Sequence, residues 1–199
     1  MKIKLKMTKL VFLTALFGSA GLFLSMVFGP SSSGAPASHT GAPGEQTCAV
    51  SGCHDDNALN SGTAKLNIDA GNISNYIPGK TYPIKIQILD AGIQRFGFQI
   101  TALSLSENKN IGKLLVTDVL KTQYMNNLVE YKDREYITYT FNGTDALEPG
   151  VGEWVVNWKA PSENLGPVIF YVGAVSANDN ENDKGDFTYT SQLTINDSK

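Results

Sequence analysis

The chain has few of the residues that carry most enzyme chemistry. Its 199 residues include only two histidines, His39 and His54, and two cysteines, Cys48 and Cys53. No G-x-S-x-G, Walker or H-E-x-x-H motif occurs. Because both histidines lie close together near the start of the chain, a hydrolase triad in the rest of the protein is excluded. We therefore expect a protein that is not an enzyme of these classes.

Basic residues are scarce after residue 37. Four of the 16 Lys and Arg residues lie in the first nine positions, which leaves 12 basic against 19 acidic residues and a net charge of −7 for the rest. No Lys/Arg cluster alternates with aromatic residues. Nucleic acid and anionic membrane surfaces are therefore not expected partners.

Residues 1–37 have the features of an export signal. Four lysines precede a mainly apolar stretch, 10–28, and Ala35-Pro36-Ala37 offers a cleavage site. The apolar stretch is also just long enough to span a bilayer, so an uncleaved N-terminal anchor is the alternative. In either case the rest of the chain would be exported, as a periplasmic, cell-surface or secreted protein, where both disulfides and covalent haem are possible.

The two cysteines and one histidine form a C-x4-C-H motif, Cys48-Ala-Val-Ser-Gly-Cys53-His54. A Cys…Cys-His run is typical of c-type haem attachment, although the usual spacer has two residues. Both thiols bond to the porphyrin, and the histidine that follows them becomes the proximal iron ligand. We therefore predict covalent haem c at Cys48, Cys53 and His54.

The same motif leaves other interpretations open. A Cys48–Cys53 disulfide suits an exported chain, although such a short loop gains little from chain entropy. A zinc site would need a fourth protein ligand, and His39 is the candidate nearest in sequence to Cys48, Cys53 and His54. If haem is bound, His39 is the first choice for the second axial ligand and Met125 the other.

The chain divides into three parts. After the signal or anchor, residues 38–62 are rich in Gly, Pro, Ser, Asn and Asp, which predicts a loop-like extension that carries the Cys/His motif. This extension must dock on the next domain or be ordered by a group that it binds. Residues 63–196 then alternate between apolar and polar side chains in short segments, which is typical of β-strands.

Seven or eight such segments predict an all-β fold, an antiparallel immunoglobulin-like sandwich. We expect Trp154 and Trp158 in its core, and find only residues 112–125 ambiguous. The strands are predicted at 64–68, 82–89, 96–102, 136–141, 153–159, 168–172 and 187–195.

Several short motifs recur in an order that resembles the Reeler (reelin N-terminal-like) domain of exported bacterial proteins, over residues 66–195. They are Tyr76-x-Pro78-Gly79-Lys80, Phe96-Gly97-Phe98, Trp154-x-x-x-Trp158-x-Ala160-Pro161 and Phe170-Tyr171-x-Gly173-Ala174. In these relatives, a segment like Thr40-Gly-Ala-Pro-Gly-Glu45 precedes a haem-type motif. The resemblance implies an immunoglobulin-like sandwich in an extracellular or surface setting, and no settled biochemical activity.

The segment Asn178–Asp186 concentrates side-chain oxygens. Calcium prefers such ligands, so a loop site at Asp179–Asp186 is one interpretation, although the EF-hand pattern is absent. We favour a solvated connection between strands, in which Asn and Asp adopt unusual backbone angles.

Two functions follow from these observations. The first is an exported single-haem c-type protein for electron transfer or haem-based sensing, with a redox partner protein. The second is an extracellular binding or adhesion module with a Cys48–Cys53 disulfide, no haem and a surface ligand.

Overall fold

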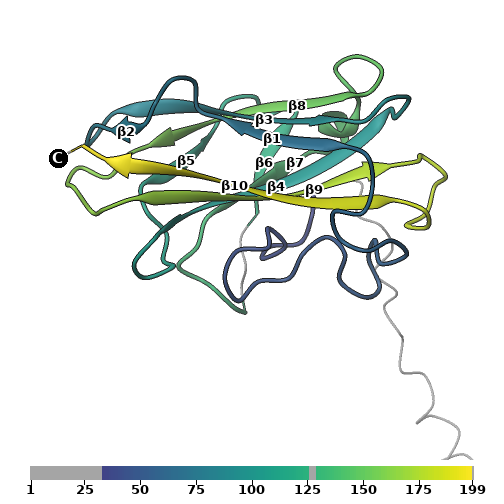
Figure 1. The fold of residues 1–199 in the computed structure, drawn as a ribbon, viewed down its shortest axis with the longest axis horizontal. Coiled ribbons are helices and arrows are strands. Elements are labelled where there is room, and N and C mark those ends of the chain that lie inside the picture. The colour runs from purple at the N-terminus through teal and green to yellow at the C-terminus, as the bar shows by residue number, and fades with distance from the viewer. Residues whose placement is uncertain (1–32, 126–128, 199) are drawn as a thin grey trace, which may run out of the picture.

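The computed structural model describes residues 33–125 and 129–198, and Figure 1 shows that they form two β-sheets packed face to face. One sheet has four strands, in the order β1-β3-β8-β5, and the other has six, in the order β2-β10-β9-β4-β7-β6. All pairs are antiparallel except the short parallel pair of β2 with β10. The all-β immunoglobulin-like sandwich expected from the sequence is confirmed. The predicted export signal lies mostly outside the described residues.

The strands follow the alternating segments of the sequence closely. The ambiguous stretch 112–125 contains two short strands, and the predicted strand 136–141 ends early and leads into a 3₁₀ helix. The elements are β1 (Lys65–Asp69), β2 (Asn75–Tyr76), β3 (Thr81–Leu89), β4 (Arg95–Ser104), β5 (Lys113–Val116), β6 (Thr122–Met125), β7 (Tyr136–Tyr139), η1 (Phe141–Thr144), β8 (Val151–Lys159), β9 (Val168–Ala177) and β10 (Phe187–Asp197).

Two tryptophans of β8 fill the space between the sheets. Trp154 stacks on Phe98 of the opposite sheet with ring centroids 4.5 Å apart, and its indole nitrogen donates to a backbone carbonyl. Trp158 contacts Phe170 edge-to-face at 5.4 Å and donates to Ile111 O at 2.9 Å. Both indoles are buried with their N–H groups paired, as large amphipathic side chains in a core require. The predicted core position of both tryptophans is confirmed.

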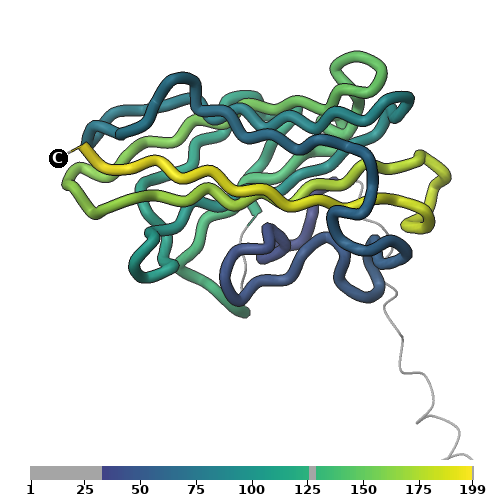
Figure 2. The backbone as a smooth tube through the Cα atoms, in the orientation of Figure 1, coloured from purple at the N-terminus to yellow at the C-terminus, as the bar shows by residue number. Residues whose placement is uncertain are grey.

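The N-terminal extension lies along the outer face of the six-stranded sheet, as the dark segment of Figure 2 shows. Gln99, which faces away from the core, is completely buried beneath it. Its amide donates to Pro36 O at 2.7 Å and accepts from His39 N at 2.8 Å. In β9, a side chain at Gly173 would place its Cβ 2.4 Å from His39 O, so only glycine permits this close approach. The extension therefore docks as an integral layer of the domain.

No helix within 33–125 or 129–198 has the length and hydropathy needed to cross a membrane.

Candidate functional site

The segment from Thr40 to Glu45 anchors the extension through a buried ion pair. Glu45 Oε1 lies 2.6 Å from Arg134 Nη1, and neither side chain is more than 5% exposed. The same carboxylate accepts hydrogen bonds from Tyr136 Oη at 2.8 Å and Thr40 Oγ1 at 2.6 Å. Because both carboxylate oxygens are paired, this buried charge is compensated. The arrangement fixes the chain just before the Cys/His motif.

Cys48 and Cys53 are free thiols in different environments. Cys48 is buried with its Sγ 3.8 Å from His39 O, and burial raises the pKa of its thiol to about 12. Cys53 is partly exposed, and burial together with Asp183 and Asp55 raises its pKa. The Cys48–Cys53 disulfide that the sequence left open is therefore not formed in this structure.

His54 is held in one orientation by a buried carboxylate. Its Nδ1 lies 2.7 Å from Asp186 Oδ2, and the Asp186 side chain is only 2% exposed. The second carboxylate oxygen accepts from Asn178 N at 2.9 Å. Because an ionised carboxylate accepts but cannot donate, the proton of a neutral His54 lies on Nδ1. The unprotonated Nε2 is then left to accept a hydrogen bond or to ligate a metal.

His54 lines a pocket of about 330 Å³ at one end of the six-stranded sheet. At Gly97, an added Cβ would lie 2.6 Å from the Tyr139 ring, so this glycine makes room for an aromatic wall. The pocket combines apolar surfaces with a polar rim, a composition typical of ligand sites. Its apolar lining includes Phe96, Tyr139, Phe141, Val175 and Ala177, and its polar lining includes His54, Arg95, Asp179, Glu181 and Asp186.

Arg95 links the two loops that border this pocket. Its guanidinium pairs with Asp145, and its Nε lies 3.4 Å from Asp179 Oδ1. The same group lies 5.9 Å from the centre of the Phe141 ring, within cation–π range. The arginine is therefore largely neutralised by carboxylates and supports the aromatic side of the pocket.

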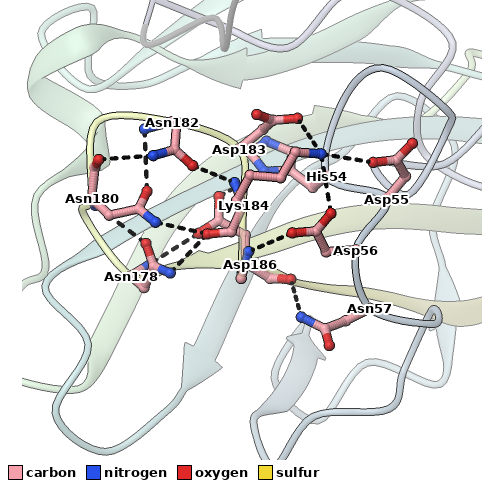
Figure 3. A network of polar contacts seen from close by, with 11 residues as sticks. His54, Asp55, Asp56, Asn57, Asn178, Asn180, Asn182, Asp183, Lys184 and Asp186 are labelled. Atoms are coloured by element: carbon pink, nitrogen blue, oxygen red, sulfur yellow. Dashed lines mark hydrogen bonds and ion pairs between the residues drawn. The ribbon is translucent and has the colours of Figure 1, made fainter.

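The loop between β9 and β10 has the solvated, turn-rich form that we favoured (Figure 3). The side-chain oxygens of Asn178, Asn180 and Asn182 each accept the backbone N–H two residues later. The intervening Asp179 and Glu181 have positive φ angles of 58° and 65°. This alternation explains the Asn-x-Asn-x-Asn pattern as successive Asx turns.

The described His, Cys, Asp and Glu side chains of the acidic loop and the Cys/His motif are not grouped as a cluster of metal ligands. In residues 33–125 and 129–198, no three His, Cys, Asp or Glu side chains are grouped so that they could hold a metal ion. His39 Nδ1 lies 2.9 Å from Ala37 O, and the residue lines a different pocket from His54. Met125 ends β6 and lines neither pocket. Ligation of one haem iron by His54 together with His39 or Met125 therefore stays a prediction.

Sequence analysis did not single out Arg95 or Phe141 as site residues, and it considered Asp186 only as a member of a possible calcium loop. Asp186, Arg95 and Phe141 come from three segments far apart in the chain, and none belongs to a motif with a known spacing. Asp186 carried the clearest signal, because it ends the Asn-rich loop directly before a strand. Such a position places a side chain at the edge of a sheet, where loops from other strands meet.

Comparison with known proteins supports the fold. No protein-family model and no curated protein matches the chain. Among solved structures, the human F-spondin reeler domain is similar, with a TM-score of 0.50 and 18% identity over 72% of this chain and 96% of that domain. A cohesin module of a family 33 glycoside hydrolase from Clostridium perfringens gives a TM-score of 0.43 and 9% identity, over 68% of this chain and 95% of that module. The likeness to the reeler domain shows that the chain has a Reeler-like β-sandwich fold.

Proposed function

We propose that the chain is an exported binding module that holds its ligand in the pocket at His54. One observation carries this proposal. The extension delivers His54 to the pocket, and the buried Asp186 fixes its imidazole at 2.7 Å. A buried carboxylate that orients an imidazole at a cavity is typical of a preorganised recognition site.

The lining of the pocket favours a glycan as the surface ligand. Phe141 is 56% exposed and Tyr139 also lines the pocket, so flat aromatic surfaces are available to the apolar face of a sugar ring. The carboxylates of Asp179 and Glu181 and the imidazole of His54 line the same pocket and can accept hydrogen bonds from hydroxyl groups.

Titration of the full chain with a panel of mono- and oligosaccharides tests this function. We expect backbone amide NMR shifts confined to residues that line the pocket. Phe141→Ala should abolish them, whereas Leu105→Ala, which removes a similarly exposed apolar side chain elsewhere, should not. Shifts that persist in Phe141→Ala, or no shift with any sugar at millimolar concentration, would rule out a glycan site in this pocket.

Covalent haem c at the same place is the second candidate, and the His54–Asp186 pair favours it. A proximal histidine that donates its Nδ1–H to a carboxylate presents Nε2 to iron. His54 and the partly exposed Cys53 fit such a group. Cys48 does not fit it in this conformation, because its thiol is buried beneath the His39 carbonyl. Attachment at both cysteines would therefore require the segment before Cys53 to open.

Intact mass analysis of the exported protein, made with the haem-attachment machinery, separates the two candidates. An added tetrapyrrole mass that Cys53→Ser abolishes would establish haem c and replace the glycan proposal. A mass equal to that of the bare polypeptide, or two hydrogens less, would exclude covalent haem and leave the binding module as the proposed function.

A further inference from the structure

We propose that the ammonium group of Lys184 holds the β9–β10 loop against the extension and thereby positions His54 at the pocket. Its Nζ lies 3.0 Å from Asp56 Oδ1, 3.4 Å from Asp55 Oδ1 and 3.4 Å from Asp183 Oδ2. An ammonium group has three donors and no acceptor, so three carboxylates match it. Figure 3 shows this lysine between the extension and the loop.

The lysine joins two segments that both carry negative charge. Asp55 and Asp56 directly follow His54 in the extension, whereas Asp183 and Asp186 belong to the loop. Without a cation between them, these carboxylates would repel one another. The hydrogen bonds to the neighbouring carboxylates raise the pKa of Lys184, mainly through Asp56, so its charge is maintained.

Two further contacts depend on this junction. Gly185 N donates to Asp56 Oδ2 at 3.1 Å, and Asn57 Nδ2 donates to Asp186 O at 2.9 Å. His54 lies two residues before Asp56 in the chain, and its imidazole contacts Asp186 directly. Lys184 therefore does for this loop what a bound metal ion does in other acidic loops: it brings oxygen-rich segments together. His54 is placed as a consequence.

The junction is open to solvent, unlike the buried ion pair at Glu45. The Lys184 side chain is 57% exposed, and its partners are between 22% and 37% exposed. Salt screens exposed pairs strongly, since the Debye length falls to about 3 Å at 1 M ionic strength. High salt should therefore reproduce part of the effect of removing the lysine.

Native-state hydrogen exchange of the full chain tests the proposal without a ligand. In Lys184→Met, we expect the Gly185 amide to exchange about tenfold faster, because its acceptor Asp56 is released. The Gly41 amide, which donates to Gln46 O near the other anchor, should keep its rate. The hydrogen-bonded His54 Nδ1–H signal should weaken in the same variant, and Lys184→Arg should restore both readouts.

A matched variant, Lys109→Met, removes another exposed lysine that pairs with a single carboxylate, Glu107, and should change neither readout. If Lys184→Met leaves Gly185 exchange and the His54 signal unchanged, the positioning role is wrong. If it accelerates exchange at Gly41 equally, the lysine contributes to global stability only. Because neither readout needs a ligand, these outcomes are independent of whether the pocket binds a glycan.

Discussion

The extension is attached to the sandwich at two places that differ in solvent access. At the first, Glu45 and Arg134 form an ion pair with both side chains at most 5% exposed. At the second, His54 meets the buried Asp186, but the surrounding pairs of Lys184 are open to solvent. The first attachment joins the extension to Arg134, just before β7, whereas the second borders the pocket.

This difference suggests a division of roles. Removing one partner of a buried, fully paired ion pair strongly destabilises the protein, because the other charge is left buried and unpaired. The Glu45–Arg134 pair therefore fixes the extension on the sandwich. Exposed ion pairs contribute little individually and respond to salt. The attachment at Glu45 therefore belongs to the fold, whereas the pairs of Lys184 around His54 should respond to salt. The predictions below test this distinction, beginning with the largest expected effect.

Glu45→Ala should destabilise the protein most. It leaves the Arg134 charge buried without its partner, which costs about 3–5 kcal/mol in comparable sites. Denaturant unfolding measures this loss. Lys109→Met, which breaks an exposed pair, should change the free energy of unfolding by less than about 1 kcal/mol. Equal effects of the two variants would contradict the assignment of Glu45 as the structural anchor.

The first described residues should also contribute to stability. The buried Gln99 amide donates to Ala35 O and Pro36 O, so a chain that begins at Ser38 would leave this donor unpaired. We expect such a chain to be less stable than one that begins at Ser33, by about 1–3 kcal/mol. Equal free energies of unfolding for the two chains would show that the contacts of Ala35 and Pro36 do not stabilise the fold. Such a result would also favour cleavage of the predicted export signal after Ala37.

Most of the fold could be predicted from the sequence, whereas most of the site could not. Ile84, Ile86 and Ile88 alternate with polar residues, and this period of two directly reports a strand with one buried face. Residues 112–125 remained ambiguous because β5 and β6 have only four residues each, too few to show a period.

The site depends on contacts between distant segments, which a local pattern does not encode. His54 was singled out as a haem ligand, a role that stays a prediction, and its partner Asp186 lies 132 residues away. The role of Glu45 was also hidden. The motif that contains Glu45 was noted only as part of a resemblance. Its ion-pair partner, the buried Arg134, lies in a segment without regular periodicity, so no local pattern linked the two residues.

A further prediction, which applies only at alkaline pH, concerns the stability of the Cys48 region. In the unfolded chain this thiol ionises near pH 9.0, whereas the buried thiol has a pKa of about 12. Between these values the native state retains a proton that the unfolded state loses, so stability falls as pH rises. For this group alone the slope reaches about 1.4 kcal/mol per pH unit. The stability of Cys48→Ala should fall less steeply over the same range, and parallel curves would contradict the burial of the thiol.

The central claim is that Asp186 fixes the His54 imidazole at the pocket with its proton on Nδ1. The ¹⁵N spectrum of the two histidine rings in the full chain, recorded under conditions where both are neutral, tests it most directly. We predict that His54 is almost entirely the Nδ1–H tautomer, and that Asp186→Ala returns it to the mixture of an unrestrained histidine. A wild-type His54 that carries its proton on Nε2 would contradict the account.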